Sequence, residues 1–167
     1  MSVTEHRRGA PVSVRCFVLT VSDTRIEATD SGGDAIADLL QQAGHVVSRR
    51  ALVRDDPAAV AAMVREELAL GRCRVFVVTG GTGIARRDTT YEALVTLFDK
   101  EIVGFGELFR MLSYQEIGSA AMLSRATAGI AGNLPIFLLP GSEHAVRLAM
   151  TKLIIPELGH VIGELQK

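Results

Sequence analysis

Three runs with the character of β-strands alternate with segments of helical spacing along the first half of the chain. The runs at residues 14–21 and 74–78 are short, apolar and rich in β-branched residues, and residues 46–53 form the run between them. Strands that alternate with helices build parallel βαβ units, whose helices cover both faces of the sheet. The pattern predicts an α/β protein: a three-layer α/β/α sandwich around a mostly parallel sheet.

The helices between these runs have recognisable ends. Over residues 32–43, apolar side chains recur at i, i+3, i+4 and i+7, and Gly44 is suited to end the helix. The second helix is expected to begin at Pro57, with Asp56 as its N-cap, and to end at Gly71.

A third helix is expected where Thr89 and Glu92 show the spacing of a capping box. Its buried face should carry Tyr91, Leu94, Val95 and Phe98. Residues 104–117 predict a further helix.

The last part of the chain predicts a hairpin and two helices. Residues 126–131 and 136–139 are short extended runs on either side of a turn, which indicates an antiparallel edge to the sheet. Ser142 is suited to cap the helix that follows, and Pro156 to open a final short one. The order of the strands beyond the first three stays open.

Length and composition fit one globular domain. The chain has 167 residues, of which 48% are hydrophobic and 22% charged. Residues 1–12 are polar and lack the apolar run of a signal peptide. We expect them to form a flexible N-terminal tail before a single domain over residues 13–167. No stretch reaches the roughly 18 apolar residues of a membrane helix, so no membrane partner is expected.

The two cysteines predict a reducing environment. Cys16 and Cys73 lie beside apolar segments, and their separation matches neither a zinc site nor a redox pair. We therefore expect two buried free thiols in a cytoplasmic protein.

The charge of the chain argues against broad electrostatic capture of anionic partners. The net charge is −1, the isoelectric point is about 6.4, and there is no Trp to stack on bases. Nucleic acid is therefore not expected as a partner. An anionic ligand must be held by local geometry instead.

Four polar or glycine-rich segments follow predicted strands. They cover residues 22–24, 55–56, 79–83 and 140–142. In an open α/β sheet, ligands bind beyond the carboxyl ends of the strands, where the strand order reverses. This edge is where we expect the chemistry.

The glycine loop at this edge is a candidate phosphate cradle. It carries Gly80, Gly81, Thr82 and Gly83, whose backbone N–H groups can approach an anion closely. It is not a P-loop, and Arg86 stands where a dinucleotide fingerprint needs its third glycine. Arg86 and Arg87 favour an anion nearby, although an ordinary strand-to-helix turn stays open as the alternative.

Two aspartates exceed what helix capping needs. If Asp56 caps one helix and Thr89 the next, then Asp55 and Asp88 are spare at the same sheet edge. Two carboxylates beside a phosphate cradle can hold Mg²⁺ for phosphoryl or nucleotidyl transfer. The alternative is that both only assist helix N-termini through the helix dipole.

Gly141 and Ser142 form a second candidate anion seat, because they end a strand and open a helix. The alternative is an ordinary N-cap. Two such seats on one chain suit an elongated ligand with phosphate in more than one place.

The motifs together resemble the MoaB/MogA family of molybdenum-cofactor biosynthesis proteins. The segments that carry the resemblance are LTVSDTR (19–25), DSGG (30–33), TGGTGIARRDTT (79–90), EIVGFGELFRMLSYQEIGSAAMLSRATAG (101–129) and LPGS (139–142). The resemblance extends over about residues 14–160, and the segment GFGELFRMLSYQEIG is more similar to the MoaB branch.

The resemblance implies a domain that binds molybdopterin and transfers AMP from Mg-ATP to the phosphate of this pterin, releasing pyrophosphate. The family's catalytic aspartates correspond to Asp55 and Asp88. Substrate-binding positions correspond to Ser22, Asp23, Gly80, Gly81, Thr82, Gly83, Gly141 and Ser142. Glu107 is expected to face the same cleft. The resemblance also implies a homotrimer or homohexamer.

Two other functions stay open. Members of the MoaB branch differ in activity, so the protein could be a non-catalytic carrier or scaffold for molybdopterin. An unrelated nucleotide binder, such as a flavodoxin-like protein, is the other alternative. Separately, residues 104–123 carry more apolar side chains than one small sheet covers, which indicates a subunit interface.

Overall fold

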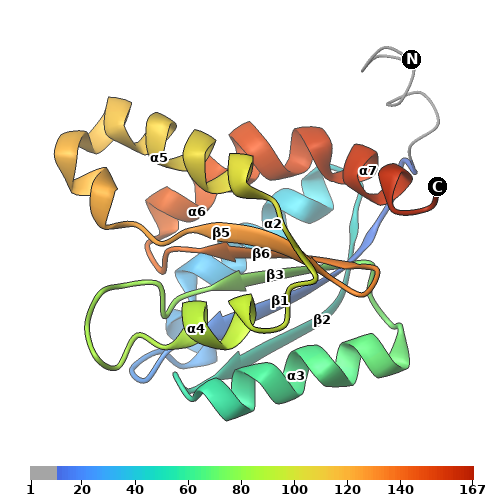
Figure 1. The fold of residues 1–167 in the computed structure, drawn as a ribbon, viewed down its shortest axis with the longest axis horizontal. Coiled ribbons are helices and arrows are strands. Elements are labelled where there is room, and N and C mark those ends of the chain that lie inside the picture. Colours follow the sequence, from blue (N-terminus) through green and yellow to red (C-terminus); the bar gives the residue numbers. More distant parts are fainter. Residues whose placement is uncertain (1–10) are drawn as a thin grey trace.

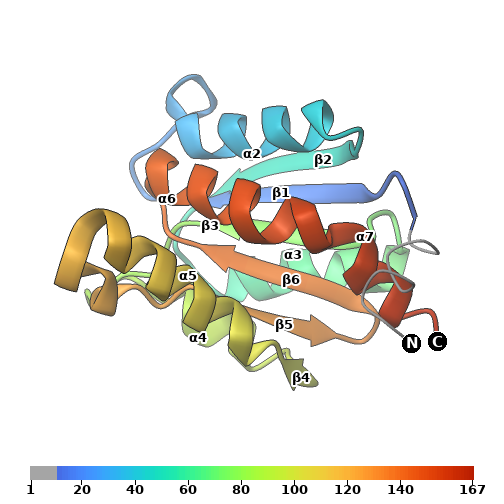
Figure 2. The ribbon, with the colours of Figure 1, turned by 90° about the horizontal axis from the view of Figure 1, so that it is seen from above.

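The computed structural model describes residues 11–167. They form three layers, with one six-stranded sheet between two layers of helices. In Figure 1, α3 and α4 lie below the sheet, and α2, α5, α6 and α7 lie above it; Figure 2 shows the upper layer face on. The predicted fold class is confirmed. Most of the tail expected over residues 1–12 falls on residues 1–10, which lie outside the described residues.

The strand order in the sheet is β2-β1-β3-β6-β5-β4. The strands are β1 (Arg15–Val21), β2 (Val46–Val53), β3 (Val75–Thr79), β4 (Lys100–Glu101), β5 (Thr127–Ala131) and β6 (Leu134–Leu139). Four neighbouring strands, β2, β1, β3 and β6, are parallel, whereas β5 pairs antiparallel with both β6 and β4. The hairpin and the antiparallel edge are therefore present, and β4 extends that edge by a short strand that the sequence did not predict.

The helices begin close to their predicted positions. They are α2 (Ser31–Gln42), α3 (Pro57–Leu70), α4 (Thr90–Val95), α5 (Val103–Ile117), α6 (Glu143–Ala149) and α7 (Ile155–Glu164), with the short 3₁₀ helices η1 (Glu27–Thr29) and η2 (Gly118–Leu123) and the π-helical segment η3 (Met150–Ile154) between α6 and α7. Asp56 and Ser142 cap their helices as predicted, by accepting from Ala58 N and Ala145 N. Within residues 11–167, no helix is both long enough and apolar enough to cross a membrane.

Two hydrophobic clusters hold the layers together. One lies under α2, α5, α6 and α7 and contains Ile36, Phe105 and Phe137. The other lies under α3 and α4 and contains Phe17 and Phe76, whose ring centroids are 4.5 Å apart. Both faces of the sheet are thus buried, which explains why β1 and β3 are nearly continuous apolar runs.

The predicted capping box of α4 is wrong. The Thr89 hydroxyl donates to Asp55 Oδ1 at 3.0 Å rather than capping its own helix, and Glu92 forms an ion pair with Arg125. Long-range partners therefore replace the local ones that the spacing suggested. The helix also ends at Val95, so Phe98 lies beyond it, although it still packs on the second cluster.

The cysteines are buried and free, as predicted. Burial is the main cause that raises the pKa of each thiol to about 12, for Cys16 and for Cys73. A thiol reacts with alkylating reagents as its thiolate. We therefore expect negligible iodoacetamide labelling of the native protein at pH 8 and labelling at both cysteines in guanidinium chloride, measured by mass spectrometry. Rapid native labelling would show that these thiols are accessible.

Candidate functional site

The carboxyl ends of the parallel strands converge on one pocket of about 480 Å³. Because β1 lies between β2 and β3, the chain crosses over β1 and reverses the strand order there. Ten of the residues predicted for the site line this pocket: Ser22, Asp23, Asp55, Gly80, Gly81, Thr82, Gly83, Asp88, Gly141 and Ser142. Val21, Thr24, Arg25 and Arg87 complete the lining.

The glycine loop passes so close to its neighbours that side chains do not fit. Gly80 has φ +102°, and a Cβ there would lie 2.0 Å from the Val21 carbonyl oxygen. Gly81 has φ +66°, and its Cβ would meet the Thr90 hydroxyl and Asp55 Oδ2. The turn therefore needs glycine for both conformation and space, and it leaves backbone rather than side chains facing the pocket.

Asp55 is not the spare acid that the sequence suggested. Its Oδ1 accepts from Thr89 N at 3.2 Å and from the hydroxyls of Thr89 and Thr90 at 3.0 and 3.3 Å. Asp55 thus caps α4 from the end of β2, which agrees in part with the alternative of a helix-terminus role. Its own N–H donates to Asp23 Oδ1 at 3.1 Å. No residue in the described part of the chain donates a hydrogen bond to Asp55 Oδ2.

Asp88 is held by the loop that precedes it. Its Oδ2 accepts from Ala85 N at 3.0 Å, and its own N–H donates to the Ala85 carbonyl at 3.0 Å. A Cβ on Gly83 would lie 2.4 Å from Asp88 Oδ2, so a side chain there would displace the Asp88 carboxylate. Asp88 therefore keeps one carboxylate oxygen without a hydrogen-bond partner in the described part of the chain.

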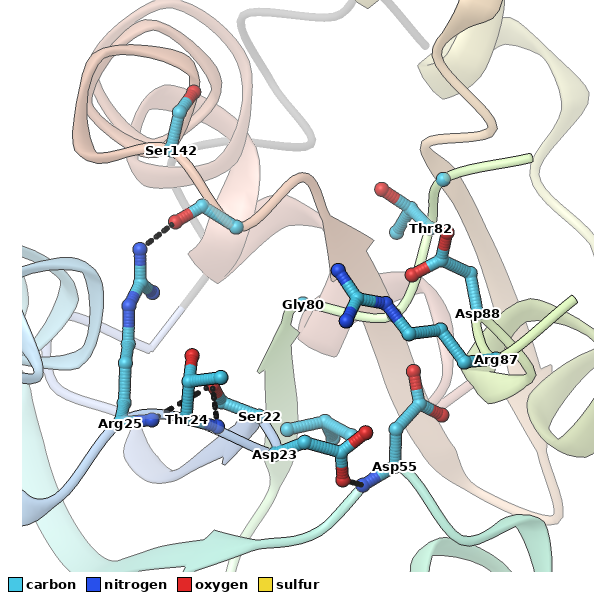
Figure 3. Close-up of a pocket in the computed structure, with 14 residues that line it drawn as sticks. Ser22, Asp23, Thr24, Arg25, Asp55, Gly80, Thr82, Arg87, Asp88 and Ser142 are labelled. Carbon is cyan, nitrogen blue, oxygen red and sulfur yellow. Dashed lines mark hydrogen bonds between the residues drawn. The ribbon is translucent and has the colours of Figure 1, made fainter. Parts of the chain in front are cut away.

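Two arginines bring positive charge to the pocket. Arg25 Nη2 donates to the Gly141 carbonyl at 2.7 Å and so links the loop after β1 to the loop after β6. In the view of Figure 3, Arg87 lies on the opposite side from Arg25, with Asp55 and Asp88. Within residues 11–167, Arg87 has no hydrogen bond or ion pair to another side chain, which leaves its donors for a ligand.

Sequence reasoning missed Arg25 as a site residue, although it noted Arg87 as a cation near the loop. Arg25 ends the LTVSDTR segment, two residues after the predicted site residue Asp23, and that position was the available signal. Its partner Gly141 lies 116 residues away, and no local pattern indicates that contact.

The two serines of the lining orient backbone around the pocket. Ser22 Oγ accepts from Thr24 N at 3.3 Å and Arg25 N at 3.1 Å, and Ser142 Oγ accepts from Ala145 N at 3.3 Å. Each hydroxyl keeps its own proton to donate to a ligand. Glu107, by contrast, is exposed on α5 and does not line the pocket.

The acids fit a Mg²⁺ ion only together with ligand oxygens. Residues 11–167 contain no group of three or more side chains placed to hold a metal by themselves. Mg²⁺ is commonly bound by one or two carboxylates plus substrate phosphates and water. The free oxygens of Asp55 and Asp88 match that need, because both lie on the pocket that the glycine loop surrounds.

Comparison with known proteins identifies the family. Residues 17–160 match the family described as "Probable molybdopterin binding domain". The chain belongs to this family. It is also 52% identical to the molybdenum cofactor biosynthesis protein B of Bacillus cereus, and the match covers 100% of this chain and 99% of that one.

Solved structures agree with this membership. The tungsten cofactor synthesizing protein MoaB from Pyrococcus furiosus has a TM-score of 0.83 and 39% identity, over 95% of this chain and 100% of that one. A crystal structure of a molybdenum cofactor biosynthesis protein B reaches a TM-score of 0.90 at 52% identity, over 94% and 98%. The predicted MoaB/MogA membership and the likeness to the MoaB branch are confirmed.

Proposed function

We propose that the protein acts in molybdenum cofactor biosynthesis by binding molybdopterin in this pocket and transferring AMP from Mg-ATP to its phosphate. The observation that carries the proposal is the convergence of both aspartates, the glycine loop and the loop at Gly141 on one pocket. Its volume of about 480 Å³ lies in the usual range for small-molecule sites.

The phosphates are bound by backbone and by two cations. The N–H groups of the glycine loop supply donors, and the guanidinium of Arg87 lies beside them without a partner among the described residues. Arg25 adds a planar fork of donors at the loop of Gly141. These groups hold anions locally, as a chain of net charge −1 requires.

The reaction forms one P–O bond and breaks another. A phosphate oxygen of molybdopterin attacks the α-phosphorus of ATP, the bond from that phosphorus to the α,β-bridging oxygen breaks, and pyrophosphate leaves with its electron pair. Mg²⁺, when bound with the nucleotide, would neutralise phosphate charge. Asp55 and Asp88 would hold it, and Arg25 and Arg87 would orient the phosphates and stabilise the charge on the leaving group.

A pyrophosphate assay tests the proposal. Purified protein is incubated with molybdopterin and Mg-ATP, and pyrophosphate and adenylylated pterin are measured. We expect both products in equal amounts. Pterin binding without pyrophosphate release would instead establish the carrier function. One observation favours that function: Asp55 Oδ1 already accepts hydrogen bonds at the start of α4.

The buried free thiols support a cytoplasmic location.

We also propose that the protein assembles through the outer face of α5 and η2. Phe105 and Phe109 turn inward and are buried, but other apolar side chains of this segment remain exposed by 48–78%. These are Val103, Leu108, Met111, Tyr114, Ile117, Met122 and Leu123. Such an exposed apolar patch is typical of a subunit interface.

Charge placed on this face should break the assembly. We expect light scattering to give a trimer or hexamer for the native protein and a mass near one chain for Met111→Glu. Leu70→Glu is the matched control, because Leu70 is 56% exposed at the end of α3 and lies outside the patch. A native mass of one chain at micromolar concentration would contradict the proposal.

A further inference from the structure

The side chain of Arg125 contacts the glycine loop without lining the site pocket. Arg125 lies between η2 and β5. Its Nε donates to the Thr82 carbonyl at 3.1 Å, and its Nη2 donates to the carbonyls of Gly83 and Asp88 at 2.6 and 3.0 Å. The side chain is 26% exposed. One guanidinium thus binds three carbonyls, at both ends of the segment 82–88 that leads from the glycine loop towards α4.

These contacts decide which way the loop N–H groups point. A trans peptide places its C=O and N–H on opposite sides, and no peptide bond of the described chain is cis. Because the Thr82 carbonyl faces Arg125, the N–H of Gly83 must point away from it. The Asp88 carbonyl also faces Arg125, so the N–H of Thr89 points away, and this N–H donates to Asp55 Oδ1 at 3.2 Å.

Arg125 is itself held by the first turn of α4. Its Nη1 forms an ion pair with Glu92, and its guanidinium lies over the Tyr91 ring, 5.0 Å from the centroid. The Arg125 hydrogen bond is the main cause that holds the pKa of Glu92 below its usual value. Arg110, on α5, donates to the carbonyls of Ser124 and Ala126 at 3.4 and 3.0 Å and so fixes the backbone on both sides of Arg125.

We propose that Arg125 is a positioning residue for the transfer reaction: it orients the Gly83 N–H towards the phosphate and, through Thr89, sets the place of Asp55. The proposal rests on the proposed function. A planar guanidinium suits this role because its fixed fork meets several carbonyls at once, whereas an ammonium is a point charge. Misplacement by about 1 Å at a catalytic site is enough to cost roughly 100-fold in rate.

The kinetic test compares Arg125→Lys and Arg125→Ala with Arg72→Ala. Arg72 is a half-exposed arginine that precedes β3 and pairs with Glu66 and Glu67. When Arg72 is replaced, Glu67 keeps its ion pair with Arg49. We expect kcat to fall about 100-fold in Arg125→Ala. Arg125→Lys should keep the native melting temperature yet lose at least about tenfold in kcat. Arg72→Ala should keep kcat.

Hydrogen exchange separates this inference from the proposed function. Amide exchange at residues 80–89 should be faster in both Arg125 variants than in the native protein and in Arg72→Ala. If the native protein releases no pyrophosphate, the proposed function fails. The exchange rates alone then decide whether Arg125 holds the backbone of the glycine loop in place. If Arg125→Ala does not fold, Arg125→Lys supplies both measurements. Native kcat and native exchange in Arg125→Lys would overturn the inference.

Discussion

Asp55→Asn and Asp88→Asn are each expected to lower the rate of pyrophosphate release about 100- to 1,000-fold. Asparagine keeps an oxygen that can accept from the N–H groups of Thr89 and Ala85. It removes the negative charge that would hold the metal of Mg-ATP. Because that charge acts mainly in the transition state, molybdopterin affinity should change only a few-fold.

The neighbouring aspartate provides a matched control for this experiment. Asp56 caps α3 through Ala58 N and does not line the pocket. Asparagine is also a good N-cap, so Asp56→Asn should retain both stability and turnover. The rates are measured from pyrophosphate release and the affinities by pterin titration. Native turnover in both Asp55→Asn and Asp88→Asn would refute a catalytic role for these acids.

Gly80→Ala is expected to lower the free energy of unfolding by about 3–5 kcal/mol. The new Cβ would lie 2.0 Å from the Val21 carbonyl oxygen, in backbone that cannot rotate away as a flexible side chain does. This overpacking adds to the cost of a positive φ at a residue with a Cβ. The free energy of unfolding is measured in guanidinium chloride, and the melting temperature should fall by about 10 °C.

Two other glycines separate the conformational cost from the steric one. Gly44 and Gly71 also have positive φ, at +84° and +61°, but a Cβ at either would meet nothing within 4 Å. Gly44→Ala and Gly71→Ala should therefore cost only about 1–2 kcal/mol each, the cost of a Cβ in left-handed backbone. The close approach of the glycine loop to β1 would be disproved if Gly80→Ala were no more harmful than these variants.

The site was predictable where it depends on strand ends and on glycine. Asp55, Gly80 and Gly141 each follow a recognisable strand, and parallel strands bring their carboxyl ends to one edge. The hydrogen-bond partners were not predictable, because they come from segments far apart in the chain. Thr89 has the local spacing of a capping residue but donates to Asp55, 34 residues earlier.

The hairpin of β5 and β6 also shows what the sequence could predict and what it could not. The sequence predicted a turn over residues 132–135 and a second arm of the hairpin that begins at residue 136. In the structure β6 begins at Leu134, because Pro135 pairs only with β5 and the ladder to β3 starts at Ile136. At that position no hydrogen bond to β3 is lost.

The sequence by itself determined the α/β class, the carboxyl ends of the parallel strands and most of the residues around the pocket, because periodicity, capping residues and glycines act over short distances. Only the tertiary structure decided how those residues are used. It engaged Asp55 at the start of α4, brought Arg25 to the loop of Gly141 and placed Arg125 against the glycine loop. The reason is physical: a buried donor or acceptor takes the partner that packing supplies, and packing joins segments that sequence order separates.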